Sequence, residues 1–199
     1  MPEQEANQNA IFEWICSQTP EAARVLDIGC GDGELLAMLS EKRRVKATGI
    51  EISESLVVKA VQRGLSVHHG NVEEGLDHYS DKNFDVVVLS LALQEMKQPL
   101  RVLEESFRVG KHVVVVFPNF GYWRVRWQLA ILGRAPRTPS FPHPWSASPN
   151  RHYYTIKDWE EFCREQGWKV EAKSFLNQGK AVCCMPNLMA EVAMYNMTD

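Results

Sequence analysis

The stretch RVLDIGCGDG, residues 24–33, decides the fold of this chain. Its apolar run, residues 24–28, ends at three glycines, Gly29, Gly31 and Gly33. Over residues 34–42 the apolar side chains then recur on one helical face. Glycines at a strand-to-helix turn let a ligand approach the backbone closely, and the helix N-terminus offers free N–H groups to an anion. The stretch therefore predicts a strand, a ligand-binding turn and a helix.

Two acidic residues near this turn narrow the choice of ligand. The dinucleotide-binding pattern G-x-G-x-x-G would need glycine at position 34, where this chain has Glu34. Asp27 precedes the first glycine by two residues and suits an ammonium group better than a pyrophosphate. Glu51 follows the last glycine by 18 residues, and an acid at this distance can accept both ribose hydroxyls. A ligand that is zwitterionic at one end and a ribonucleoside at the other is S-adenosylmethionine (or S-adenosylhomocysteine), which we predict as the cofactor. The alternative is that the glycines only make a tight turn and that Glu51 is a surface acid.

Short β-branched runs alternate with helical patterns through the first two-thirds of the chain. Further strands are expected over 47–50, 65–68, 84–90 and 111–117, and helices over 54–62, with Ser53 as N-cap, and 100–109. Near-continuous runs of Val and Leu are typical of strands in a sheet whose two faces are both covered by helices. The order of elements predicts an α/β fold with a doubly wound, mainly parallel sheet.

The charge distribution separates a later segment from the rest of the chain. The 52 residues between Glu105 and Asp158 contain no Asp or Glu but eight Lys or Arg, which leaves 14 bases against 25 acids elsewhere. Five of the six tryptophans lie at or after position 123, and five prolines fall within 133–150. We expect an aromatic helix over 122–132, an extended loop over 133–150, and a helix from the cap Thr155 to about Gln166. Strands are expected over 169–175 and 181–185, as a closing antiparallel pair.

Length and composition favour one globular domain. The chain has 199 residues, of which 45% are hydrophobic and 24% charged. We expect an N-terminal helix in 1–22, a cofactor-binding half in 23–118, an insertion that is a lid or a partner-binding segment in 119–154, and a closing helix and strands in 155–199. No apolar run approaches the ~18 residues that span a bilayer, and the acidic N-terminus predicts no signal peptide. Five cysteines without a C-x-x-C pair predict neither a disulfide framework nor a metal site, so we expect a cytoplasmic protein.

Several motifs carry a resemblance to a known family. VLDIGCGDG (25–33) followed by GIE (49–51) resembles motif I and its partner acid in class I S-adenosylmethionine-dependent methyltransferases. More narrowly, the chain is similar to the methionine biosynthesis protein MetW family in RGLSV (63–67), FDVV (84–87), FRVG (107–110), FPNFGYWR (117–124) and PNRH (149–152). The resemblance covers about residues 24–176. It implies the seven-stranded sheet of those methyltransferases and a role in methionine biosynthesis alongside a homoserine O-acyltransferase.

Two sets of site residues follow from the pattern and the resemblance. The cofactor is expected to contact Asp27, Gly29, Cys30, Gly31, Gly33, Glu51, Ile52, Asn71, Val72 and Ser90. A partner protein or a methyl acceptor is expected to contact Tyr122, Trp123, Arg124, Arg126, Trp145, Arg151 and His152. The alternative is that the arginines of this segment pair with the acidic first half of the chain. Asn71 departs from the family, because many relatives have Asp there, but an amide can still hydrogen-bond the adenine amino group.

No catalytic residue can be assigned. The segment after Ser90 has neither an N-P-P-Y signature nor a cysteine, and Glu95 could act as a base but is more simply a solvated carboxylate. His68 and His69 are interpreted as loop residues. Cys183 and Cys184 are interpreted as core residues of an apolar strand. Helix and core packing is also the expected role of Met185, Met189 and Met194.

Three functional hypotheses remain. The first is a partner or regulatory subunit of the acyltransferase that senses S-adenosylmethionine, which the resemblance and the missing acid–base signature favour. The second is a stand-alone methyltransferase on a small anionic acceptor, with residues 119–154 as its lid. The third, an RNA methyltransferase that uses the basic segment, is disfavoured by an isoelectric point of about 6.1, and binding to nucleic acid or membrane is not expected.

Overall fold

The computed structural model describes residues 2–199, and its centre is an eight-stranded sheet of order β3-β2-β1-β4-β5-β8-β6-β7. The strands are β1 (Arg24–Ile28), β2 (Lys46–Glu51), β3 (Val67–His69), β4 (Phe84–Ser90), β5 (Gly110–Pro118), β6 (Lys169–Asn177), β7 (Lys180–Ala181) and β8 (Val192–Thr198). The helices are α1 (Pro2–Gln18), α2 (Glu34–Arg43), α3 (Glu54–Gln62), α4 (Pro99–Val109), α5 (Trp123–Ala130), α6 (Ile156–Gln166) and α7 (Pro186–Met189). Two short 3-10 helices are η1 (Val72–Glu74) and η2 (Leu93–Glu95).

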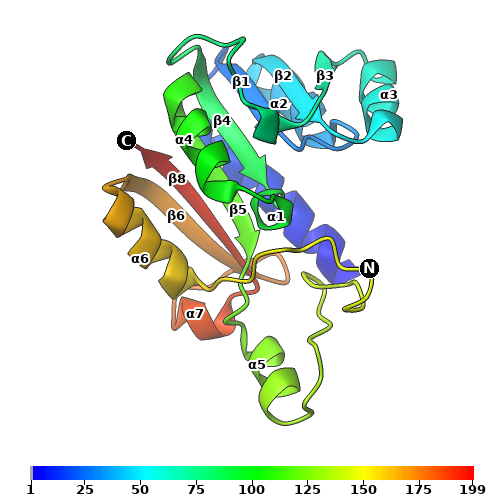
Figure 1. Cartoon of the computed structure of the whole chain (residues 1–199), viewed down its shortest axis with the longest axis vertical. Helices are drawn as coiled ribbons and strands as arrows, with labels where there is room; N and C mark the ends of the chain where they lie inside the picture. Colours follow the sequence, from blue (N-terminus) through cyan, green and yellow to red (C-terminus); the bar gives the residue numbers. More distant parts are fainter. Residues whose placement is uncertain (1) are drawn as a thin grey trace.

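Strands β1 to β5 are parallel, and their valine-rich segments are buried on both faces. Val86 and Val88 pack with α1 and α2, whereas Val87 and Leu89 pack with α4 and α6. Figure 1 shows α4 and α6 on the near face of the sheet and α1 behind it. The prediction of a doubly wound α/β fold is therefore confirmed, and the five strands of the first half lie within two residues of their expected ends.

The C-terminal strands differ from the prediction. The expected strand 181–185 is wrong, because only Lys180–Ala181 pairs with β6 and the chain then leaves the sheet edge. It doubles back through α7 so that β8, which the sequence analysis did not identify, can insert antiparallel between β5 and β6. The two-residue β7 raises the strand count to eight instead of seven.

This rerouting also overturns the interpretation of several apolar residues. Cys183 and Cys184 are exposed free thiols rather than core residues. Met185 and Met189 are exposed as well, because they belong to the returning loop and α7, while Met194 on β8 is fully buried.

The insertion, residues 119–154, has a small core of its own. Tyr122, Val125 and Phe141 are buried against one another, with Phe120 packed at their side. The expected aromatic helix is observed as α5, and in Figure 1 it extends away from the sheet. Residues 131–155 contain one isolated bridge, between Thr138 and Phe141.

Two predicted helix caps have different outcomes. Thr155 and Asp158 form the reciprocal capping box expected at the start of α6. Ser53 occupies the N-cap position of α3, but its side chain makes no capping hydrogen bond, because its hydroxyl lies 3.1 Å from that of Ser55. Among residues 2–199, no helix combines the length and the hydropathy needed to cross a membrane.

Candidate functional site

The glycine turn after β1 requires glycine for backbone conformation at all three positions and for close packing at two of them. All three have positive φ, at 73° for Gly29, 58° for Gly31 and 81° for Gly33. A Cβ on Gly29 would lie 2.9 Å from the Cβ of Ala92, and one on Gly33 would lie 2.3 Å from Cδ1 of Leu65. A Cβ on Gly31 would meet nothing within 4 Å. Gly29 and Gly33 therefore permit close packing, while Gly31 leaves open space in front of the turn.

Asp27 is a buried carboxyl group at the end of β1, in the centre of the parallel sheet. Its side chain is 2% exposed, and Oδ1 has no hydrogen-bond partner within residues 2–199. Burial, with the negative charge of Glu51 as a smaller contribution, raises the pKa of Asp27 from 3.8 to about 7. A buried acceptor without a partner is rare in folded proteins and marks a position where a donor from a ligand would be satisfied.

Glu51 ends the neighbouring strand β2, and the backbone around it holds its carboxylate in place. Oε2 accepts a hydrogen bond from the backbone N–H of Gly31 at 2.9 Å, and Oε1 accepts one from that of Ser53 at 2.8 Å. Each oxygen keeps a further lone pair. The side chain is thus oriented at the edge of the turn with accepting capacity to spare.

Two cavities meet over this turn. The first, here called the Glu51 cavity, has a volume of about 420 Å³, and Glu51, Ile52, Leu56, Asn71, Val72 and Met96 are among its walls. The second, here called the Asp27 cavity, has a volume of about 370 Å³, and Asn7, Gln8, Asp27, Cys30, Ser140 and Asn150 are among its walls. Four residues line both cavities: Gly29, Gly31, Leu91 and Glu95. The two cavities are therefore adjacent, and these four residues are here called their junction.

The predicted cofactor residues come together at this site, with one exception. Asp27, Cys30 and Ser90 line the Asp27 cavity, and the Glu51 cavity contains Glu51, Ile52, Asn71 and Val72. Gly29 and Gly31 lie at the junction, whereas Gly33 lines neither cavity and instead packs on Leu65.

Two of these residues have features that the sequence did not indicate. Asn71 caps η1, because its Oδ1 accepts from the backbone N–H of Glu73 at 3.1 Å. Burial, followed by the charges of Asp27 and Glu51, raises the pKa of the Cys30 thiol to about 12, which disfavours the reactive thiolate near neutral pH.

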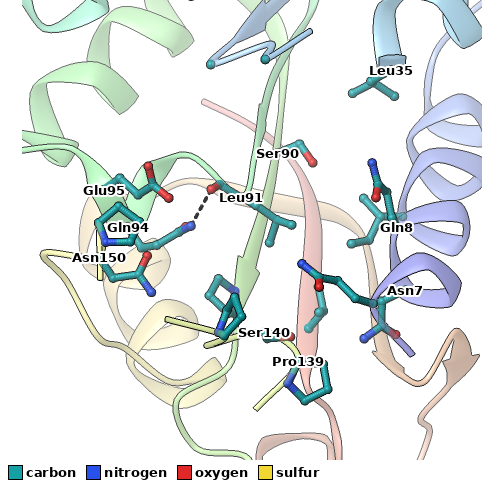
Figure 2. A pocket seen from close by; sticks show the side chains of 18 of the residues that line it. Asn7, Gln8, Leu35, Ser90, Leu91, Gln94, Glu95, Pro139, Ser140 and Asn150 are labelled. Carbon is teal, nitrogen blue, oxygen red and sulfur yellow. Dashed lines mark hydrogen bonds between the residues drawn. The ribbon is translucent and has the colours of Figure 1, made fainter. Parts of the chain in front are cut away.

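Leu91 and Gln94 shape the junction, and the sequence analysis named neither as a site residue. Leu91 has a left-handed backbone with φ of 57°, which costs energy for a residue with a branched side chain. The Gln94 amide donates to the Leu91 carbonyl at 2.5 Å, as Figure 2 shows. The backbone carbonyl of Gln94 accepts from the backbone N–H groups of Arg151 at 2.8 Å and His152 at 3.0 Å. Gln94 thus ties the end of the insertion to the strained turn after β4.

The opposite wall of the Asp27 cavity comes from α1 and the insertion. Figure 2 shows Asn7 and Gln8 on one side, Ser140 between, and Asn150 on the other side beside Gln94 and Glu95. Glu191 at the start of β8 joins the two, because Oε2 accepts from Asn7 Nδ2 at 2.9 Å and Oε1 accepts from Ser140 N at 3.3 Å. Burial raises the pKa of this carboxyl group. These contacts span up to 184 residues of sequence, so no local pattern could have indicated them.

The second predicted set does not gather at the cavities. Tyr122 is buried and donates to Asn177, Arg124 pairs with Glu3 at 3.6 Å, and Arg126 donates to the Gly121 carbonyl. Trp123, Trp145 and Arg151 are exposed. His152 lines a separate apolar cavity of about 250 Å³ between α4 and α6.

Charge in the Asp27 cavity is almost entirely negative. Its walls include Asp27, Asp32, Glu34 and Glu95, with His143 as the basic side chain and no Lys or Arg among the described lining residues. Within residues 2–199, no three His, Cys, Asp or Glu side chains gather in a group that could hold a metal ion. The site as a whole is thus suited to a ligand with cationic and hydroxyl groups.

Comparisons with known proteins agree with this geometry. A bifunctional methionine biosynthesis protein MetXA/MetW from Rhodopirellula baltica is 31% identical over 94% of this chain, which spans only 32% of that relative's length. An S-adenosylmethionine-dependent methyltransferase from Thermotoga maritima, a possible histamine N-methyltransferase, superimposes with a TM-score of 0.70 at 18% identity and covers 98% of this chain and 90% of its own. One from Mesorhizobium loti gives 0.70 at 16% identity, over 96% of this chain and 98% of its own.

These structural likenesses establish the class I methyltransferase fold. The sequence profile described as methionine biosynthesis protein MetW matches residues 9–197. The chain therefore belongs to the methionine biosynthesis protein MetW family.

Proposed function

We propose that the protein binds S-adenosylmethionine across the two cavities and acts with a homoserine O-acyltransferase as a partner or regulatory subunit. The observation that carries the first part is the unpartnered, buried carboxyl group of Asp27 beside an open glycine turn. The cofactor, when bound, supplies an electrophilic methyl group on a sulfonium sulfur. The residues of the chain bind and orient this cofactor.

The residues present fit the parts of this cofactor. Asp27 Oδ1 would accept from the ammonium group, which removes the cost of a buried acceptor without a donor. The spare lone pairs of Glu51 would accept from the ribose hydroxyls. Ile52, which is 66% exposed, would cover a face of the adenine, and Asn71 at the end of β3 would lie at its polar edge.

Support for a protein partner comes from a relative and from the surface of α5. The relative from Rhodopirellula baltica carries MetXA and MetW in one name and one chain. In this chain Trp123, Trp127 and Ile131 recur at every fourth residue, so they share one helix face, and they are 41%, 54% and 61% exposed. An exposed aromatic stripe with arginines beside it has the composition of a protein interface.

A stand-alone methyltransferase on a small anionic acceptor has less support. The acceptor would enter the Asp27 cavity, where carboxyl groups predominate and the described walls offer no Lys or Arg. The described walls therefore lack a bidentate arginine for such an acceptor. The arginines of the insertion lie outside this cavity.

Cofactor binding can be tested by isothermal titration calorimetry with S-adenosylmethionine. Asp27→Asn should weaken binding about 30-fold or more, because a charge-assisted contact in a buried site is replaced by a neutral one. Glu104→Gln on the exposed face of α4 is the control and should leave the affinity unchanged. Equal affinities for wild type and Asp27→Asn would contradict the assignment of the ammonium site.

The partner role can be tested with the acyltransferase of the same organism. Homoserine acylation should be faster with this protein than without it, and Trp127→Ala should remove most of the stimulation while S-adenosylmethionine binding persists. Val61→Ala, a change of a similarly exposed apolar residue on α3, is the matched control. Stimulation that is absent, or that survives Trp127→Ala and Trp123→Ala together, would refute the partner surface.

A further inference from the structure

If S-adenosylmethionine binds across the two cavities, its sulfur would lie at their junction. The sulfur joins the nucleoside to the amino-acid portion, and these portions would occupy the Glu51 and Asp27 cavities respectively. Of the four residues that line both cavities, Gly29, Gly31 and Leu91 are uncharged and Glu95 is the one with a charged side chain. This step rests on the proposed binding of S-adenosylmethionine.

Glu95 also differs from three other acids in these walls. Asp32 pairs with Arg63 at 2.7 Å, Glu34 accepts from Gln8 at 2.9 Å, and Glu51 accepts from two backbone N–H groups. Within residues 2–199, Glu95 has neither an ion pair nor a side-chain hydrogen bond, and Figure 2 shows its side chain in the wall of the Asp27 cavity. Like the carboxyl group of Asp27, that of Glu95 therefore remains available to a ligand.

The surroundings of Glu95 favour a cation. Glu95 is exposed to solvent, and a partial loss of hydration raises the pKa of its carboxyl group, with His143 opposing and Glu51 adding to the effect. Its backbone is held at the end of η2, next to Gln94, whose contacts fix the turn after β4. A sulfonium carries a positive charge but no acidic proton. Beside Glu95, it would stabilise the ionised carboxylate when the ligand displaces water from the cavity.

We propose that Glu95 recognises the sulfonium charge, so that the protein discriminates S-adenosylmethionine from S-adenosylhomocysteine. The two molecules share the adenosine, the ammonium and the carboxylate groups, and they differ in the methyl group and in the charge on sulfur. Asp27 and Glu51 face the shared parts. A group that reads the difference must lie at the junction, and Glu95 is the charged residue there.

This arrangement suits a sensor better than a catalyst. In methyl transfer, the bond between sulfur and methyl carbon breaks, its electron pair stays on sulfur, and the sulfonium charge is lost. A carboxylate beside the sulfonium therefore stabilises the bound cofactor more than the transition state. Glu95 would favour retention of S-adenosylmethionine, which a regulatory subunit requires.

The test compares both ligands by calorimetry with the full chain. For wild type, S-adenosylmethionine should bind about tenfold or more tightly than S-adenosylhomocysteine. In Glu95→Gln the ratio should approach one, because only the affinity for S-adenosylmethionine falls. Asp27→Asn should weaken both ligands and keep the ratio, since the ammonium group is common to both. Glu104→Gln, the same change on an exposed face of α4, should alter neither affinity.

The outcomes separate this inference from the proposed function. A wild-type protein that binds neither ligand would refute the cofactor site and the inference together. Binding of both ligands with equal affinity, or a Glu95→Gln variant that loses both equally, would overturn the role of Glu95 and leave the cofactor site standing. Melting temperatures confirm that each variant is folded before its affinities are compared.

Discussion

Residues 24–95 and residues 119–199 build opposite walls of one site, and they do so in different ways. In the first region, Asp27 and Glu51 each lie at the carboxyl end of a parallel strand, and the sheet brings them together. In the second, Ser140 on the insertion is held by Glu191, which precedes β8 and also binds Asn7 of α1. The first wall depends on local patterns of strand and turn, and the second depends on contacts between distant segments.

The largest expected effect concerns the buried charge of the first region. Asp27 ionises near pH 3.8 in the unfolded chain, whereas the folded protein holds its proton up to about pH 7. Between about pH 4 and about pH 7, the folded state therefore binds more protons than the unfolded state. The free energy of unfolding should fall by up to about 4 kcal/mol as the pH rises through this range, and it should level off above about pH 7. Urea unfolding at a series of pH values measures this decline.

Asp27→Asn is the control for this prediction. The difference in stability between wild type and the variant isolates Asp27 from other groups such as Glu191, whose raised pKa acts in the same direction. A difference that does not change between pH 4 and 7 would show that Asp27 is ionised throughout. S-adenosylmethionine should also bind more tightly as the pH rises over the same window, because its ammonium group pairs with the carboxylate.

The next effect compares one glycine from each region. Gly33→Ala should cost about 2 to 3 kcal/mol, because φ is 81° and the new Cβ would meet Leu65 and Ala60. Gly133→Ala in the insertion should cost about 1 kcal/mol, since φ is 59° but the space around it is open. Thermal unfolding of both variants tests whether packing behind the glycine turn, rather than backbone conformation alone, requires Gly33. Equal losses of stability in the two variants would contradict a packing requirement for glycine at position 33.

A smaller effect is expected at the contact that joins the two walls. Asn7 donates to Glu191 and accepts from the backbone N–H of Gly179 at 2.7 Å, so Asn7→Ala should cost about 1 to 2 kcal/mol. It should also release the insertion, which hydrogen exchange at the Ser140 amide would detect as faster exchange. Gln4→Ala, in the same helix and the same cavity wall, is the comparison. Unchanged exchange at Ser140 would mean that Glu191 holds the insertion without Asn7.

The sequence predicted the first region well because its signals are local. Buried strands, turn glycines and the residues that follow each strand end are all encoded within about ten positions, which is why Asp27, Glu51 and Asn71 could be placed in advance. Gln94 could not, because its importance comes from the backbone of Arg151 and His152, more than fifty residues later. Strand β8 was missed for a related reason, since its neighbours β5 and β6 are not adjacent to it in the chain.

The smallest expected effect concerns residues 181–185, where an apolar sequence led to a wrong strand prediction. Residues 181–185 are apolar and look like a buried strand, yet the chain needs them to return from the sheet edge, and Cys183 and Cys184 are exposed. A thiol reagent should therefore modify two cysteines in the native protein and leave Cys16, Cys30 and Cys163 unreacted until it unfolds. Cys183→Ser and Cys184→Ser should each change stability by no more than about 0.5 kcal/mol. Slow modification of both thiols, or a loss of several kcal/mol in the free energy of unfolding of either variant, would mean that this segment packs as a strand after all. The difference between the two regions would then be smaller than their contacts indicate.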